Sequence, residues 1–187
     1  AAITAAMATA HKTVFFPNGT YELQKGIGLN RGTNTKLHLE GESRDGVFII
    51  PDIPYLEANY NGGDLENGGV RLAHMINLDD STPFNSVDVS IENMTIDMRD
   101  QRVMGVSPRT YNVVGHGIRI GEGWVSGQFS VNNVTIRNTA TYGIGIQDRG
   151  GHPKNNVTLT NLHLERIGGD GMDLKEAADR GAGHGLV

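Results

Sequence analysis

The sequence contains no cysteine in its 187 residues. Disulfide bridges and thiolate metal sites are therefore excluded. The chain also lacks an apolar run near the roughly 18 to 20 residues that a membrane-spanning helix needs. Its net charge is -5, and its basic residues are scattered. Nucleic-acid binding requires clustered positive charge, so we expect no nucleic acid among the partners. Because a long apolar run is lacking, we also expect a soluble protein without a membrane as partner.

Aromatic residues are also few, at 6% of the chain, whereas glycine occurs 26 times. Together with frequent asparagine and threonine, this composition favours many short strands and tight turns over long helices. The Ala-rich start, AAITAAMATA at 1–10, is the exception, because Ile3 and Met7 are four positions apart. We expect a short helix there that caps one end of the fold. Since the chain begins in this helix and stops at a strand-like GHGLV, we expect a single domain over 1–187 that is a fragment truncated at both ends.

Internal repeats organise the rest of the chain. Three segments align without gaps, namely SIENMTID at 90–97, SVNNVTIR at 130–137 and TLTNLHLE at 158–165. Each is followed by a second short strand, in turn HGIRI at 116–120, YGIGI at 142–146 and DGMDL at 170–174. Short strands that recur with Gly or Asn at the corners predict a parallel β-solenoid, in which equivalent residues of successive coils stack about 4.8 Å apart. Asn93, Asn133 and Asn161 fall into register as a corner ladder.

An earlier unit extends the pattern towards the N-terminus. LHLE at 37–40 is followed by DGVFI at 45–49, with the same five-position step that separates the strands of the last two units. On this alignment, Asp45-Gly46 and Asp170-Gly171 lie at the same corner. An Asp-Gly pair suits a turn, because aspartate bonds nearby backbone groups and glycine accepts a positive φ. We therefore favour a turn role for Asp170 over a catalytic one, and keep both interpretations.

The first part of the chain adds a resemblance to a known family. AAITAAMATAHKTVFFPNGTYELQKGIGL, followed by TKLHLEGESRDGVFII, resembles the opening of the pectate-lyase-like superfamily. Its members are right-handed parallel β-helices and include pectin-active enzymes, mannuronan epimerases and phage tailspike depolymerases. The resemblance implies an all-β, right-handed parallel β-helix, a polysaccharide as partner, and an extracellular location as a secreted bacterial or phage virion protein whose export signal is not present in this chain. It also implies a homotrimer if the protein is tailspike-like.

Candidate site residues lie on the second strands of the repeats. Strict alternation of side chains divides these strands into two columns. The column with the apolar residues also contains His116, Tyr142 and Asp170. The opposite, outward column contains Arg119, Gly145 and Asp173, and continues with Gln147 and Lys175.

Asp173 breaks the coil pattern. The residues aligned with it in the other units are Phe48, Arg119 and Gly145. Arg119 lies two coils away, roughly 10 Å, with Gly145 between them. This arrangement predicts an open floor between a cation and an anion that is wide enough for a sugar ring. A solvated surface of mixed charge is an equally weighted alternative, because exposed charge pairs are common.

A long loop at 98–114, which contains an insertion of 14 positions, separates the two strands of one unit. Insertions in solenoids often build the binding face. The basic and aromatic residues that this one carries are Arg99, Arg102, Arg109 and Tyr111. They suit contacts to acidic sugars by charge and by ring stacking. The alternative is a surface loop without a role in binding.

Two further matches concern single families within the superfamily. His116 and His184 each lie in Gly-His-Gly, which resembles a polygalacturonase motif, although their order and spacing relative to GDGMDLK differ from that family. Mannuronan epimerases have Tyr-Gly-Phe-Asp-Pro-His-Glu where this chain has YGIGIQDRG. Tyr142 matches, whereas Gly145 and Gln147 replace the catalytic Asp and His. Tyr142 therefore stays a candidate proton donor, and a histidine at a corner is as readily explained by packing.

These observations favour an enzyme that cleaves an acidic polysaccharide, and they leave two mechanisms open. In β-elimination, Arg119 or Lys175 would neutralise a uronate carboxylate, while Tyr142 or a histidine moves protons. In hydrolysis, Asp173 would be one of two carboxylates, with Asp170 or a residue outside this chain as the other. The alternatives are a non-catalytic β-helix, such as a tailspike shaft or adhesin, and a uronan C5 epimerase.

The predicted site therefore has two groups of residues. The catalytic candidates are Asp173, Lys175, Asp170 and Tyr142. The substrate-binding candidates are Arg119, Gln147, His116, Arg109, Tyr111 and His184. The histidines show no spacing typical of metal ligands, so we expect neither a metal site nor a certain cofactor. Binding of Ca²⁺ stays open at surface carboxylates, namely Asp79, Asp80, Asp148 and Glu176.

Overall fold

The computed structural model of the chain describes residues 12–24, 26–28, 35–52, 74–78, 87–99, 116–120, 127–139, 141–146 and 157–174. These ranges contain strands and turns but no helix, and so none that could cross a membrane. The helix expected over 1–10 lies outside them. The strands are β1 (Lys12–Phe16), β2 (Gly19–Leu23), β3 (Ile27–Gly28), β4 (Thr35–Gly41), β5 (Val47–Pro51), β6 (His74–Leu78), β7 (Val87–Asp97), β8 (His116–Ile120), β9 (Gly127–Thr139), β10 (Ile144–Ile146), β11 (Val157–Thr160), β12 (His163–Ile167) and β13 (Met172–Leu174).

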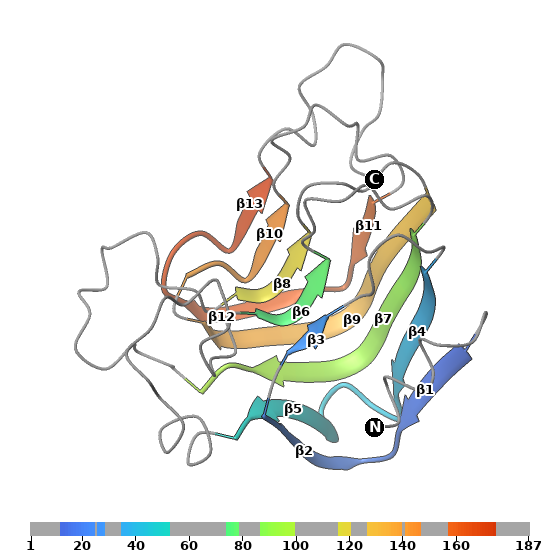
Figure 1. The fold of residues 1–187 in the computed structure, drawn as a ribbon. Coiled ribbons are helices and arrows are strands. Elements are labelled where there is room, and N and C mark those ends of the chain that lie inside the picture. Colours follow the sequence, from blue (N-terminus) through green and yellow to red (C-terminus); the bar gives the residue numbers. More distant parts are fainter. Residues whose placement is uncertain are drawn as a thin grey trace.

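The strands stack into two parallel sheets (Figure 1). In the five-stranded sheet the order is β13-β10-β8-β6-β3, and the pairings between described strands are parallel. In the eight-stranded sheet the order is β1-β4-β7-β5-β2, while β9 pairs with β7, β11 and β12. These pairings are parallel too. Because the chain returns to each sheet in the same direction, the fold is the parallel β-helix that the sequence predicts.

Two long strands, β7 and β9, curve in the middle and so contribute to two faces of the coil (Figure 1). The corner falls on Asn93 and Asn133, whose φ angles are 57° and 54°. Asparagine tolerates this left-handed conformation because its short side chain bonds local polar groups. Asn133 Nδ2 donates to Asn93 Oδ1 at 2.9 Å, and Asn161, between β11 and β12, has φ 52°. The predicted corner ladder is confirmed.

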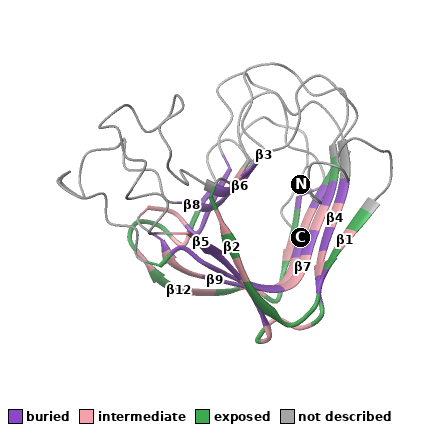
Figure 2. Ribbon diagram, turned by 60° about the horizontal axis from the view of Figure 1, so that its bottom comes forward, coloured by how far each residue is buried: buried purple, intermediate pink, exposed green. Residues whose placement is uncertain are grey.

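The core lies between the sheets and is built from columns of aliphatic side chains (Figure 2). On the five-stranded sheet Ile118 pairs with Ile144, and both are fully buried. On the eight-stranded sheet Ile96 pairs with Ile136, and both are again fully buried. Burial of each such side chain contributes about 1.5–3 kcal/mol. These stacked columns therefore hold the coils in register.

The unit of LHLE and DGVFI departs from the prediction. β4 and β5 both belong to the eight-stranded sheet, because Leu37 pairs with Val89 and Phe48 pairs with Thr95. Residues 42–46 form the corner turn between β4 and β5. At the equivalent corner, β7 and β9 each turn at a single asparagine. The five-position step of this unit is thus a longer corner turn. The predicted strand is present as β5, but its alignment with the second strands of the other units was wrong.

The observed register changes the interpretation of two residues. Asp45-Gly46 lies at a different corner from Asp170-Gly171, so it gives no support to a turn role for Asp170. Phe48 lies in the eight-stranded sheet and is not aligned with Asp173. In the coil of β4 and β5, the strand that belongs to the five-stranded sheet is β6, HMINL, which pairs with β8.

Candidate functional site

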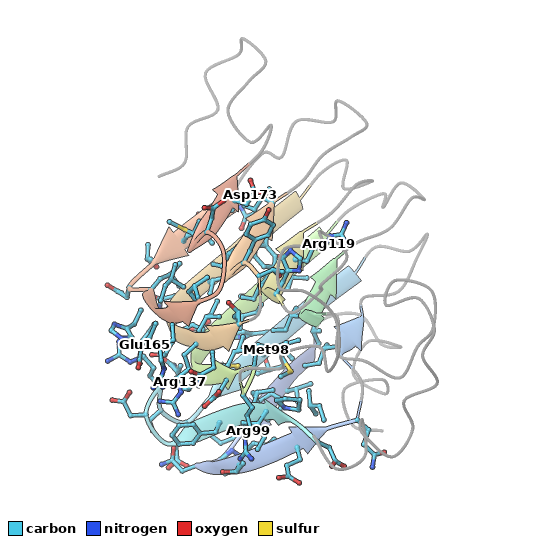
Figure 3. The ribbon with its side chains drawn as sticks, turned by 90° about the vertical axis from the view of Figure 1, so that its left-hand side faces the viewer. Met98, Arg99, Arg119, Arg137, Glu165 and Asp173 are labelled. Atoms are coloured by element: carbon cyan, nitrogen blue, oxygen red, sulfur yellow. The ribbon has the colours of Figure 1, made fainter. Side chains whose placement is uncertain are left out.

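The outward column of the five-stranded sheet has the register that the sequence predicts. Gly145 on β10 pairs with Arg119 on β8 and with Asp173 on β13. Arg119 and Asp173 are therefore two strand spacings apart, about 10 Å, and both are labelled on this sheet in Figure 3. Asp173 is only 7% exposed, and Arg119 is half-buried. A cation and a buried carboxylate thus flank a position without a side chain.

The regular alternation of the strand is broken just before this column. This break decides to which side of the sheet the preceding side chains point. Gly117 N donates to Tyr142 O at 3.2 Å, and Ile118 N donates to Gly143 O at 3.0 Å. Two successive N–H groups therefore point to the same neighbouring coil, whereas a regular strand alternates them between its edges. A Cβ at Gly117 would overlap Cγ2 of the buried Ile136, so this position faces the core, as Ile118 does.

His116 consequently points to the outward face, together with Arg119, and Tyr142 does the same one coil later. A Cβ at Gly145 would lie 3.1 Å from Cδ2 and 3.5 Å from Nε2 of His116, and 3.7 Å from Cδ2 of Tyr142. The prediction that these two rings share the apolar face was wrong, because strict alternation does not hold at Gly117 and Gly143. The break brings both rings to the floor between Arg119 and Asp173.

The two rings also contact each other. Their centroids are 5.0 Å apart, with the planes tilted by 56°. Thr141 Oγ1 lies 3.4 Å from His116 Nδ1, and so helps to orient the imidazole. Since Nδ1 faces Thr141, the Cδ2–Nε2 edge of the ring is the one beside Gly145.

The imidazole of His116 is neutral at pH 7. Its burial lowers the pKa from 6.5 to about 4, and the positive charge of Arg119 acts in the same direction. Asp173 acts in the opposite direction and is outweighed. A neutral imidazole beside a guanidinium can accept a proton while the guanidinium holds an anion.

Asp170 lies at the position that His116 and Tyr142 occupy in the preceding coils. Its carbonyl accepts a hydrogen bond from Gly143 N at 3.3 Å, as the carbonyl of Tyr142 does from Gly117 N. A Cβ at Gly171 would lie 3.2 Å from Cδ1 of Leu164, a core side chain. The expectation that Asp170 and Asp173 project to opposite sides rested on strict alternation, which this sheet does not follow.

The other predicted site residues lie outside the described residues, so the structure neither joins them to this cluster nor separates them from it. They are Lys175, Gln147, Arg109, Tyr111 and His184, together with Arg102. The surface carboxylates considered for Ca²⁺, Asp79, Asp80, Asp148 and Glu176, lie outside them as well. Within the described part of the chain, no three His, Asp or Glu side chains form a group suited to a metal ion.

Sequence reasoning missed one strand of the site. β6 places His74 beside His116 and Asn77 beside Arg119 in the backbone register. The sequence signal was available, because HMINL aligns with HGIRI without a gap and matches it at the histidine and the isoleucine. The stack of paired strands therefore continues one coil further than predicted.

Comparison with known families decides the broad class of the protein. The family model described as "Rhamnogalacturonase A/epimerase, pectate lyase-like" matches residues 1–180. The chain belongs to this family. No curated protein and no solved structure matches the chain significantly. The resemblance to the pectate-lyase-like superfamily is confirmed, and the protein is in general terms a carbohydrate-active β-helix protein.

For a member of the rhamnogalacturonase A/epimerase family, the cluster at Gly145 offers the groups that reactions at a uronic acid require. Arg119 supplies a positive charge and His116 a neutral proton acceptor. Tyr142 adds a phenol, and Asp173 a buried carboxylate. The rings of His116 and Tyr142 lie beside Gly145, which is itself buried, so these groups gather around one position of the sheet.

Proposed function

We propose that this protein cleaves a polysaccharide that contains uronic acids, bound across the outward face of the five-stranded sheet. The observation that carries the proposal is the floor at Gly145, where His116 and Tyr142 lie between Arg119 and Asp173. A family description that names a rhamnogalacturonase and an epimerase supports a polysaccharide substrate.

β-Elimination is the reaction that uses most of these groups. Arg119 would bind the uronate carboxylate and stabilise the negative charge that develops when the ring proton beside it is removed. His116, neutral at pH 7, would accept that proton from C5. The C4–C5 double bond then forms as the C4–O4 bond breaks, and Tyr142 would donate a proton to the leaving oxygen. In a uronan epimerase the same first step would be followed by return of a proton to the other face of C5.

Hydrolysis is the second candidate, because the sheet brings Asp170 into the column beside that of Asp173. An inverting glycosidase needs two carboxyl groups roughly 6.5 to 9.5 Å apart, one to protonate the leaving oxygen and one to activate water. Asp173 is buried and Asp170 exposed. The two carboxylates therefore differ in their access to the water that hydrolysis requires.

The experiment uses polygalacturonate, rhamnogalacturonan and alginate as separate substrates. Ultraviolet absorbance reports the unsaturated products of elimination, a reducing-end assay reports total cleavage, and proton NMR reports epimerised uronates. We expect unsaturated products, with His116→Gln lowering the rate by about 10²–10⁴-fold, the usual contribution of a general base. Arg166→Gln, which changes an exposed arginine on β12, serves as a surface control and keeps the rate.

The outcomes separate the alternatives. If reducing ends form without ultraviolet absorbance, and if Asp173→Asn no longer forms them, the reaction is hydrolysis and not elimination. If the ratio of the two C5 epimers of the uronate changes without cleavage, the reaction is epimerisation. Binding of these polymers without any of the three signals would overturn the enzymatic proposal in favour of a glycan-binding β-helix.

A further inference from the structure

A groove on the eight-stranded sheet lies away from the cluster at Gly145. It has a volume of about 320 Å³, and its lining comes from β5, β7, β9, β12 and the turn before β5. Arg137 and Glu165 mark it in Figure 3, apart from Arg119 and Asp173 on the other sheet. The lining residues are Arg44, Asp45, Phe48, Thr95, Thr135, Arg137, His163 and Glu165.

The strand register orders this lining into two columns. One column runs over four strands, in the order Phe48, Thr95, Thr135 and His163. The other runs in the order Asp97, Arg137 and Glu165. Four stacked strands span about 14 Å at the usual strand spacing. The rise from one coil to the next is comparable with the length of one sugar residue, so successive residues of an extended chain along the columns would lie over successive strands.

Arg137 is held in place at the centre of the groove. Its Nε donates to Asp97 Oδ2 at 2.8 Å, and its guanidinium carbon lies 5.7 Å from the centre of the Phe48 ring. Asp97 Oδ1 in turn accepts from Asn138 Nδ2 at 2.7 Å and from Arg99 N at 2.9 Å. Because the bond to Asp97 uses Nε, both Nη nitrogens are available as donors to a ligand in the groove.

The charges of the lining favour an uncharged ligand. Arg44 lies 3.2 Å from Asp45, so their charges are paired. Arg137 is paired with Asp97, and Glu165 lies 3.2 Å from Arg166 outside the lining. The lining contains two arginines and two carboxylates, so it offers an anionic polymer no excess of positive charge.

The aromatic and hydrogen-bonding groups of the lining suit a sugar, which carries hydroxyl groups on an apolar ring. Phe48 offers an aromatic surface, and a fixed guanidinium beside carboxylates offers donors and acceptors for pairs of adjacent hydroxyls. Thr95 is buried, and its Oγ1 donates to Arg44 O at 2.8 Å, so this hydroxyl can offer a ligand only an acceptor. Binding sites of this kind combine an apolar wall with a few fixed polar groups.

We infer that this groove binds a neutral, hydroxyl-rich stretch of polysaccharide, with its chain along the axis of the β-helix. The site is separate from the reaction at the five-stranded sheet and goes beyond the proposed function. It would hold an uncharged segment or side branch of a polymer, while uronic acids occupy the other face.

The test is a titration of the ¹⁵N-labelled chain with neutral tetrasaccharides of galactose, of mannose and of glucose, and with tetragalacturonate. We expect a neutral tetrasaccharide to shift the amide signals of Thr95, Thr135 and Arg137 and to leave that of Gly145 in place. If none of the neutral tetrasaccharides shifts these signals, or if tetragalacturonate shifts them instead, the inference fails.

Variants show whether the side chains of the groove carry the affinity. Arg137→Gln should raise the dissociation constant by about tenfold, the effect of losing one good hydrogen bond to a charged group, and His163→Ala by about fivefold, the effect of losing one typical hydrogen bond. His163 has a side chain that is 61% exposed, so its replacement leaves the fold intact. Gln128→Ala, at an exposed position earlier on β9, is the matched control and keeps the affinity. Unchanged binding in both groove variants would overturn the inference.

The two proposals fail separately. His116→Gln lowers turnover under the proposed function and leaves the titration of the groove as it was. Groove binding by a chain that turns over no substrate would contradict the enzymatic proposal and leave the groove proposal standing. If His116→Gln also abolishes the shifts at Thr95 and Thr135, the groove is no independent site and the inference is overturned.

Discussion

His116 begins β8 and Tyr142 lies just before β10, at equivalent positions of successive coils, and their ring centroids lie 5.0 Å apart beside the Gly145 position. Both rings reach this place because the strand alternation is broken at Gly117 and Gly143. The absence of a side chain at position 145 is thus a condition for the arrangement of the two rings, and it can be tested directly.

Gly145→Ala should lower activity with little change in stability. The added methyl group would lie 3.1 Å from His116 Cδ2, so the imidazole must move by a few tenths of an ångström. Because small displacements of a catalytic group are costly, we expect kcat/KM to fall by about tenfold or more. Steady-state kinetics and thermal unfolding check the two expectations.

The matched control is Gly19→Ala on β2. Its methyl group would meet nothing closer than 3.8 Å, which is an ordinary contact. Neither glycine has a backbone in the left-handed region, so the comparison isolates the methyl group. Full activity of Gly145→Ala would show that the observed position of His116 is not needed for the reaction.

The burial of His116 predicts how stability depends on pH. Its pKa is about 4 in the folded chain, below the ordinary value of 6.5. Between these two values the unfolded chain binds more protons than the folded one, so stability falls as the pH is lowered from 6.5 to 4. The loss amounts to about 3 kcal/mol once the pH is below both values.

His116→Gln should remove this part of the pH dependence, which denaturant unfolding at a series of pH values would measure. Thr141→Val keeps the imidazole, removes only the hydroxyl near Nδ1, and should keep the steep acid limb. A variant His116→Gln that loses stability between pH 6.5 and 4 as steeply as the native chain would contradict the assignment to this ring.

Part of the arrangement of the candidate site follows from the repeats in the sequence. Another part depends on backbone interactions that the repeats do not report. The register of Arg119, Gly145 and Asp173 follows from the repeated step between strands, because a solenoid stacks equivalent residues. The corner ladder follows from aligned asparagines in the same way. Periodicity places residues along the chain and along the stack.

The sides to which His116 and Tyr142 point depend on the backbone instead. Strict alternation fails where two successive N–H groups bond to one neighbouring coil, and only the three-dimensional structure shows this. The unit of β4 and β5 was misread because a five-residue corner turn has the same length as the step between sheets. The groove at Arg137 was missed because it joins the outer face of four strands that are far apart in the sequence.

Asn133 should contribute to stability through both its backbone and its side chain. Its φ of 54° is unfavourable for residues other than glycine and asparagine, and its amide donates to Asn93 Oδ1. We expect Asn133→Ala to lower the free energy of unfolding by about 2 kcal/mol. Asn133→Gly loses the hydrogen bond but accepts the φ angle, and so should cost about half as much. Urea unfolding would measure both, and equal losses would exclude a backbone contribution.

Asp97→Asn should destabilise the chain at neutral pH and much less in acid. Burial alone would raise the pKa of Asp97, but hydrogen bonds from the Asn138 side chain and the Arg99 backbone, together with Arg137, outweigh burial and hold the pKa below its ordinary 3.8. A lowered pKa means that the stabilisation is present above pH 3.8 and is lost as the pH falls through the folded value. We expect a loss of about 2 kcal/mol at pH 7, since charge-assisted hydrogen bonds are weakened.

The control for Asp97 is Asp45→Asn. Asp45 also pairs with an arginine, at 3.2 Å from Arg44, but its side chain is 84% exposed. Exposed pairs contribute little, so we expect a change within about 0.5 kcal/mol. Urea unfolding of both variants at pH 7 and pH 3 measures the difference. If Asp97→Asn lost as much stability at pH 3 as at pH 7, packing of the side chain, and not the charge that fixes Arg137, would be the source of the effect.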